Sequence, residues 1–121
     1  MRSDAVARQA AQFALSKKGF DVIVMDLREL SSFTDFFVIA SGHTDTHVRA
    51  IADGISENLK KRKVSPWHVE GHQNGRWVLL DFVDVVVHVF DEDIRNYYAL
   101  ERIWGDAPTI EYQDEPKKQS R

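Results

Sequence analysis

The sequence contains no cysteine. This absence excludes a disulfide framework, a thiol nucleophile and every zinc site that is built on cysteine. It also favours a protein of the reducing cytoplasm. With 121 residues, of which 43% are hydrophobic, the chain is expected to form one domain. A domain of this length buries roughly two-thirds of its unfolded surface and needs no disulfide or metal ion to hold it together.

Long apolar runs and an excess of positive charge are also missing. The longest apolar stretches have about five to seven residues, whereas a membrane-spanning helix needs about 20, so no membrane segment is predicted. Met1-Arg2-Ser3-Asp4 leads directly into a helical pattern and does not resemble a secretory signal. Proteins that bind mainly to phosphate groups usually have more basic than acidic residues. The net charge here is −3. A role beside RNA would therefore depend on contact with a protein there.

Hydrophobic periodicity and helix-breaking residues predict the order α-β-β-α-β-β-β-α. The first helix begins at Ser3 or Asp4, and Gly19 is expected to occupy the left-handed position that ends it. Residues 106–121 are polar and are predicted to be a disordered tail beyond a domain of residues 1–105. The predicted fold class is α/β, a single domain with flanking helices on a mixed five-stranded sheet of segments 20–26, 35–41, 67–70, 76–82 and 84–90. Strand 35–41 is apolar on both faces, which predicts an interior position.

The last two strands are predicted to form a hairpin with Phe82 and Val83 as its loop residues, so that Leu79 pairs with Val86. One face of this hairpin then suits a core and carries Arg76, Val78, Leu80, Val85, Val87 and Val89. The opposite face mixes large apolar groups with a histidine and carboxylates, which is typical of the centre of a protein interface. This second face comprises Trp77, Leu79, Asp81, Asp84, Val86, His88 and Phe90. The alternative is that a helix covers it, with the tryptophan buried and the histidine hydrogen-bonded to a carboxylate.

The segment after the hairpin is predicted to be one continuous helix, capped by Asp91 or Asp93 and ended by Gly105. Residues at three-residue steps share one side of a helix, and here that side carries Arg95, Tyr98, Glu101 and Trp104. A second stripe is expected to pack on the sheet and consists of Ile94, Tyr97, Leu100 and Ile103. Two stripes on one short helix imply two neighbours, the domain itself and a partner outside it.

Four ordered blocks resemble consecutive signature blocks of the Iojap family of ribosomal silencing factors. The blocks are residues 35–42 (DFFVIASG), 75–81 (GRWVLLD), 84–90 (DVVVHVF) and 95–105 (RNYYALERIWG). The resemblance covers roughly residues 5–107, and the order and spacing of four blocks are far more specific than any single block.

One position departs from the family pattern. The family usually places glycine in the last hairpin turn, where this chain has Val83. Because a β-branched residue resists positive φ, a type I or bulged turn is expected instead. A shift of one residue in the cross-strand pairing would exchange the two faces of the hairpin.

The resemblance also implies a fold and a function. Members of this family bind the universal large-subunit protein numbered fourteen, on the face of the large ribosomal subunit that meets the small one. They thereby stop the subunits associating and lower translation when nutrients are scarce. Their fold resembles the nucleotidyltransferase core, and many are dimeric, so a homodimer is compatible with this interpretation. The expected partner-binding residues are Trp77, Leu79, Asp81, His88, Phe90, Arg95, Tyr98, Glu101 and Trp104.

No catalytic residue, cofactor or metal site is predicted. A nucleotidyltransferase needs paired carboxylates to hold Mg²⁺. Ser41-Gly42 offers a phosphate-facing helix N-terminus, but no Asp-x-Asp follows, and Asp81 and Asp84 lie three apart across a turn. His43 and His47 have the helical spacing of two metal ligands without a third. Exposed histidines at a capped helix start are expected instead.

Lys60-Lys61-Arg62-Lys63 is the one basic run. We interpret it as a solvated helix end that complements the helix dipole, and the alternative is a patch that steers the protein toward nearby ribosomal RNA. Three function classes are compared. A protein-binding anti-association factor is favoured, a nucleotidyltransferase-like enzyme is disfavoured by the missing Asp-x-Asp, and a small RNA-binding adaptor is disfavoured by the acidic balance.

Overall fold

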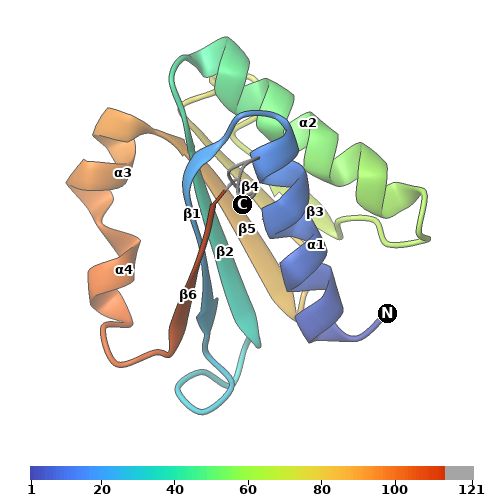
Figure 1. Ribbon diagram of the computed structural model, residues 1–121, viewed down its shortest axis with the longest axis vertical. Helices are drawn as coiled ribbons and strands as arrows, with labels where there is room; N and C mark the ends of the chain where they lie inside the picture. Colours follow the sequence, from blue (N-terminus) through green and yellow to red (C-terminus); the bar gives the residue numbers. More distant parts are fainter. Residues whose placement is uncertain (114–121) are drawn as a thin grey trace, which may run out of the picture.

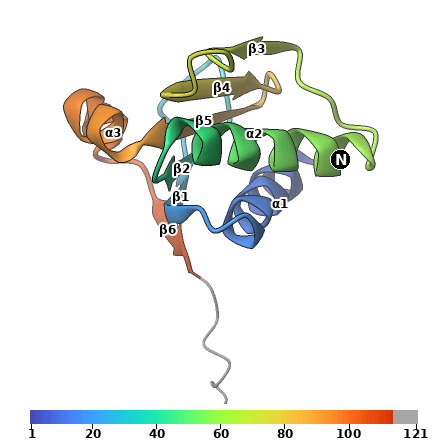
Figure 2. The same ribbon diagram turned by 90° about the horizontal axis from the view of Figure 1, so that it is seen from above.

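The computed structural model describes residues 1–113, apart from the side chains of Tyr97 and Tyr98. A six-stranded mixed sheet in the order β3-β4-β5-β2-β1-β6 carries helices on both faces (Figure 1, Figure 2). The helices are α1 (Ser3–Ser16), α2 (Asp45–Lys60), α3 (Glu92–Tyr98) and α4 (Leu100–Ile103). The strands are β1 (Phe20–Asp26), β2 (Phe36–Gly42), β3 (His68–Glu70), β4 (Trp77–Asp81), β5 (Val85–Asp91) and β6 (Thr109–Tyr112). None of the described helices is both long and apolar enough to span a bilayer.

Helices α1 and α2 cover one face of the sheet and form the main core with it (Figure 2). Apolar residues at three- and four-residue steps give α2 a single buried stripe of Val48, Ile51, Ile55 and Leu59. This stripe packs over the apolar face of the β4–β5 hairpin, whose members are Val78, Leu80, Val85, Val87 and Val89. This face of the hairpin is therefore the core face, as predicted.

The opposite face of the sheet holds a second, smaller apolar cluster beneath α3 and α4. Its buried members are Met25, Leu27, Ile39, Phe90 and Ala107. Strand β2 lies between β5, to which it is parallel, and β1, to which it is antiparallel. Because both faces of β2 are covered, the interior position predicted for this strand is confirmed.

The sheet has six strands and not the predicted five. Residues Thr109–Tyr112 form β6, which pairs antiparallel with β1 inside the segment that was expected to be a disordered tail. A five-stranded sheet would have left the outer edge of β1 with unpaired N–H and C=O groups, and β6 satisfies that edge. The rest of the expected tail, residues 114–121, lies outside the described residues.

The first helix also ends differently from the prediction. Lys18, with φ of 67°, takes the left-handed position that was assigned to Gly19. Gly19 is needed for another reason, because a Cβ there would come within 2.8 Å of the Ala14 carbonyl oxygen. At the start of the helix Ser3 does not cap the backbone, and its hydroxyl donates to the Asp35 carboxylate (2.8 Å).

The predicted register of the last hairpin is wrong by two residues. Leu79 pairs with His88, not with Val86, and the turn is centred on Val83, whose φ is 74°. The expected type I or bulged turn is therefore wrong as well. Since side chains alternate with a period of two along a strand, a two-residue shift leaves the faces of the hairpin unchanged.

Candidate functional site

An apolar groove of about 530 Å³ lies on the side of the sheet away from α1 and α2. Phe37, Leu79, Val86 and His88 form its floor, and they project from β2, β4 and β5. The first three side chains are only partly buried, although they lie on central strands. The alternation of side chains along each strand thus puts one set of residues into the main core and the other into this groove.

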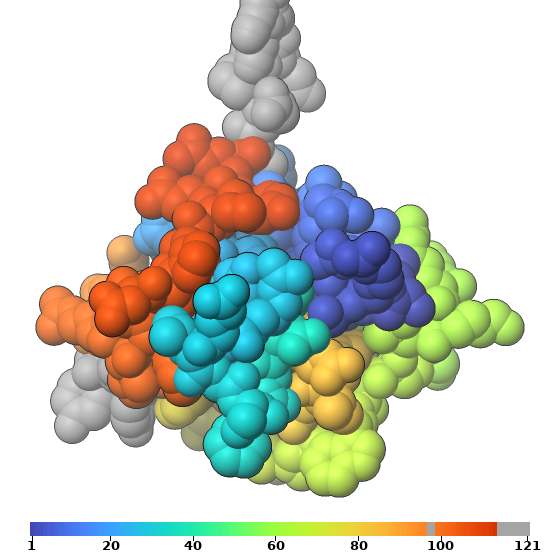
Figure 3. Space-filling model, turned by 90° about the horizontal axis from the view of Figure 1, so that it is seen from below, coloured from blue at the N-terminus to red at the C-terminus, as the bar shows by residue number. Residues whose placement is uncertain are grey.

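Large exposed side chains from loops form the rim of the groove. Phe33 is 88% exposed, Trp67 75% and Val83 54%, and Trp104 completes the wall beside α4. Figure 3 shows this end of the molecule, where the cyan loop before β2, the amber turn of the β4–β5 hairpin and the yellow-green segment before β3 come together. A contiguous apolar surface of this kind is typical of a site that binds another protein or a ligand.

Sequence reasoning missed Phe33, Phe37 and Trp67 as members of this surface. Trp67 opens the predicted strand 67–70, yet its side chain is 75% exposed. A usable signal was present, because Phe33 stands in the polar segment between two predicted strands and Trp67 follows Pro66. Large aromatic side chains in connecting loops have no sheet position that would bury them.

The predicted partner-binding residues divide into two groups. Leu79, Asp81, His88 and Trp104 line the groove. Four others do not line it. Trp77 is half-buried in the second apolar cluster, Phe90 is fully buried there, Arg95 is buried against the sheet, and Glu101 is its partner. The side chain of Tyr98 lies outside the described residues.

His88 is held in one neutral form by its neighbours. The Trp77 indole N–H donates to His88 Nδ1 (3.1 Å), so the ring carries its proton on Nε2. Burial lowers the pKa of His88 to about 4, because a charged imidazolium loses its hydration there. The alternative in which a helix covers this face gave the histidine a carboxylate partner, whereas the partner of its Nδ1 is an indole.

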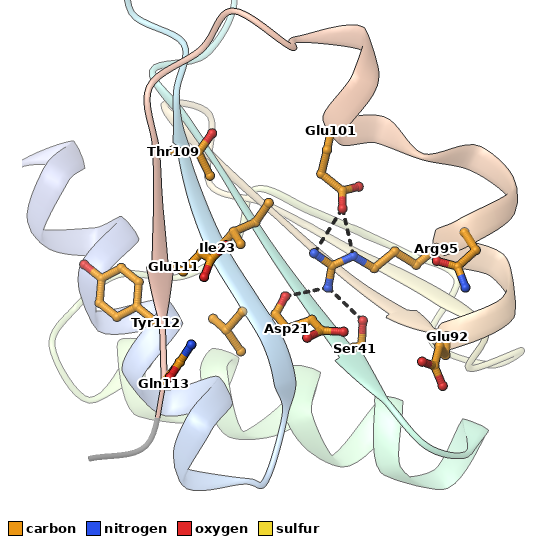
Figure 4. A pocket seen from close by; sticks show the side chains of 12 residues that line it. Asp21, Ile23, Ser41, Glu92, Arg95, Glu101, Thr109, Glu111, Tyr112 and Gln113 are labelled. Atoms are coloured by element: carbon orange, nitrogen blue, oxygen red, sulfur yellow. Dashed lines mark hydrogen bonds and ion pairs between the residues drawn. The ribbon is translucent and has the colours of Figure 1, made fainter. Parts of the chain in front are cut away.

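Arg95 joins α3 and α4 to the sheet (Figure 4). Its guanidinium donates to the Ser41 hydroxyl (2.8 Å) and to the Asp21 carbonyl oxygen, and it forms an ion pair with Glu101 (3.2 Å). Arg95 was predicted to face a partner, and the structure turns it inward instead. The left-handed backbone of Ala99 (φ 49°, ψ 53°) divides the predicted continuous helix into α3 and α4, and Glu101 of α4 meets the guanidinium of Arg95.

A polar cavity of about 520 Å³ surrounds this arginine. Asp21, Glu92, Glu101 and Glu111 place four carboxyl groups around its walls (Figure 4). The hydroxyl of Ser41, which the sequence offered as a phosphate contact, is already occupied by the guanidinium. Such a surplus of negative charge repels phosphate, so the cavity does not favour a nucleotide. The expected nucleotidyltransferase-like core stays a prediction.

His43 and His47 stack on each other at the start of α2, with ring centroids 5.5 Å apart. His47 Nδ1 accepts a hydrogen bond from the backbone N–H of His43, and its Nε2 lies 2.9 Å from the carbonyl oxygen of Lys17. Both nitrogens of His47 are thus engaged with the backbone. The pair ties the start of α2 to the end of α1 and is not arranged as a pair of metal ligands.

Comparison with known proteins places the chain in a family. The family model described as "Ribosomal silencing factor during starvation" matches residues 1–121. The chain belongs to this family. A ribosomal silencing factor from Halalkalibacterium halodurans is 41% identical over 97 residues, which are 80% of this chain and 83% of that one. The chloroplastic Iojap protein of Arabidopsis thaliana is 34% identical over 97% of this chain and 49% of its own length.

A crystal structure of a protein from Chromobacterium violaceum has the same fold. It is 32% identical, covers 99% of this chain and all of that one, and superposes with a TM-score of 0.85. The expected resemblance to the Iojap family is therefore confirmed. Membership of the ribosomal silencing factors supports a role in translation repression, and the family is named for a regulatory factor and not for an enzyme.

Proposed function

We propose that the protein binds the large ribosomal subunit through its universal protein fourteen and keeps the small subunit from joining. Translation then falls when nutrients are scarce. The observation that carries this proposal is the groove, with an apolar floor on central strands and a rim of exposed Phe33 and Trp67. Related ribosomal silencing factors come from bacteria, and the ribosomes concerned would be those of the cytoplasm.

The groove has the chemistry of a protein contact. Aromatic anchors in a desolvated centre supply most of the affinity of protein interfaces, and the groove is lined by Phe33, Phe37, Trp67 and Trp104. The net charge of −3 makes a binding mode based on phosphate neutralisation unfavourable. Inhibition would then be steric, because a domain held on the joining face of the large subunit occupies space that the small subunit needs. A homodimer is compatible with this mechanism if the groove stays free.

Copurification tests the proposed partner. The tagged protein is incubated with separated ribosomal subunits, and the ribosomal RNAs of the captured particles are identified. We expect capture of the large subunit without the small one, and loss of capture for Phe33→Ser combined with Trp67→Ser. Capture of small subunits, or equal capture by the double variant, would contradict the proposal.

The salt dependence of binding separates this proposal from an RNA-binding adaptor. Residues Lys60–Lys63 are all exposed at the C-terminal end of α2 and just after it, and are the natural candidates for a contact with ribosomal RNA. We expect the affinity for large subunits to change by less than about tenfold between 50 and 200 mM salt, whereas six to ten phosphate contacts would cost about 10³–10⁵. A steep slope that becomes shallow when all four residues are neutralised would favour the adaptor.

A further inference from the structure

The floor of the groove contains a buried hydrogen-bond donor without an acceptor. His88 is 4% exposed, and its Nε2 has no hydrogen-bonding partner among the residues that the structure describes. Because Nδ1 accepts from the Trp77 indole, the proton must sit on Nε2. A buried N–H that lacks an acceptor is unfavourable and is rare in folded proteins, where such groups usually call for an explanation.

His88 lines the groove, and apolar side chains pack against its ring. Trp77 covers the Nδ1 side of His88 and does not line the groove, whereas His88 does. Nε2 lies on the ring edge remote from that indole and is itself buried, so an acceptor reaches it as the side chains packed on the ring move aside. Phe37 packs on the ring edge to face, with centroids 4.6 Å apart, and Leu79 lies directly opposite on β4. Neither side chain can accept a conventional hydrogen bond.

We propose that the protein segment that occupies the groove presents a neutral oxygen acceptor, a main-chain carbonyl or a side-chain amide, to the Nε2–H of His88. This inference rests on the proposed function and specifies the partner's chemistry at its centre. The recognised segment is apolar where it meets Phe37, Leu79 and Trp104, and polar at the one atom that reaches the histidine.

The chemistry of the groove selects a neutral acceptor. A lysine or arginine side chain offers only donors and cannot pair with an N–H. A carboxylate would lose its hydration in an apolar groove and would approach the carboxyl group of Asp81, which lines the same groove. Carbonyl groups inside a helix are already paired with N–H groups of the next turn. A main-chain acceptor therefore comes from a loop, a strand edge or the last turn of a helix.

Two amide substitutions at His88 test the inference, because each amide mimics a different nitrogen of the imidazole ring. His88→Gln places an amide N–H near the position of Nε2, while His88→Asn keeps an acceptor near Nδ1 for Trp77 and lacks the outer donor. Binding to purified large subunits is measured by titration, and thermal unfolding of each variant is measured beside it. We expect His88→Gln to bind within about threefold of the wild type and His88→Asn to bind about tenfold or more weakly.

A second pair of variants serves if either amide fails to fold. In a Trp77→Phe background the indole donor is gone, so a further His88→Phe removes the ring nitrogens without leaving Trp77 unpaired. We expect the double variant to bind about tenfold or more weakly than Trp77→Phe alone.

The outcomes separate this inference from the proposed function. The proposed function stands when the wild type binds large subunits and the Phe33→Ser and Trp67→Ser double variant binds them more weakly. In that case, equal affinity of the Asn and Gln variants, or of Trp77→Phe with and without His88→Phe, overturns the inference alone. A wild type that does not bind large subunits overturns the proposed function, and the inference with it.

Discussion

Val83 adopts a left-handed backbone conformation at the tip of the β4–β5 hairpin, with φ of 74°. For a residue with a Cβ this conformation costs about 1–2 kcal/mol, and β-branching makes it still less favourable. The Asp81 carboxylate accepts a hydrogen bond from the Val83 N–H (2.8 Å) and holds the turn in place. The strained residue lies at the rim of the groove, so local strain and the candidate binding surface coincide.

Val83→Gly is expected to stabilise the protein. Glycine adopts positive φ without a steric penalty, and the Val83 side chain is 54% exposed, so little packing is lost. We predict a gain of about 1 kcal/mol in the free energy of unfolding, measured by urea denaturation. Val69→Gly on the edge strand β3, where φ is ordinary, is the control and should destabilise by about 0.5–1 kcal/mol. A lower denaturation midpoint for Val83→Gly would show that the turn is not strained.

His88 predicts how stability depends on pH. Its pKa in the folded protein is about 4, below the ordinary value of 6.5, because burial disfavours the charged ring. Above pH 6.5 the ring is neutral in both states, and its contribution to stability is fully present. As the pH falls from 6.5 to 4, only the unfolded chain takes up a proton, so stability drops by roughly 3 kcal/mol. Chemical denaturation across this range should show a smaller drop for His88→Gln, and an unchanged drop would contradict the assignment.

At the scale of elements, α3 and α4 are positioned by one buried side chain. Arg95 reaches the Asp21 carbonyl and the Ser41 hydroxyl, which are 74 and 54 residues away in sequence. Ala99 is the residue where the chain turns so that Glu101 can meet the same guanidinium. Local preference argues against this break, because alanine is the strongest helix former. The sequence therefore predicted a continuous helix, and contacts distant in sequence override that preference.

Arg95→Ala is expected to release α3 and α4 from the sheet. Breaking a buried pair leaves the remaining groups uncompensated and costs about 3 kcal/mol, which should appear in the free energy of unfolding. Arg76→Ala is the matched control, since the half-exposed side chain of Arg76 forms an ion pair with Asp91 (2.8 Å). Exposed pairs contribute less than about 1 kcal/mol. Similar losses in the two variants would mean that Arg95 does not anchor these helices.

At the scale of the whole molecule, the sequence predicts the core better than the groove. The α2 stripe and the alternation along β4 and β5 place their residues correctly, since a buried face imposes a period on the sequence. The floor of the groove follows the same alternation, but its rim has no such period. The rim combines Phe33, Trp67, Val83 and Trp104, which meet only after the sheet has assembled. Leu79, Asp81 and His88 of the predicted site line the groove from the hairpin, whereas Phe90 and Arg95 are buried, because pattern alone does not show what covers a face.

The exposed rim offers variants that leave the core intact. Phe33 and Trp67 lie in loops and are among the most exposed apolar residues described, so replacing both by serine should not lower the melting temperature appreciably. Ile110 on β6 is 60% exposed and does not line the groove. Ile110→Ser therefore removes a comparable exposed apolar group from another surface and serves as the control.

Light scattering from a mixture of large and small ribosomal subunits tests the central claim most directly, because joining of the subunits raises the signal. We predict that the wild-type protein and Ile110→Ser, each added to the large subunits first, both suppress the rise. The Phe33→Ser and Trp67→Ser double variant should leave it largely intact at the same concentration. A rise that the wild type does not suppress, or suppression by the double variant equal to that by the wild type, would contradict the account.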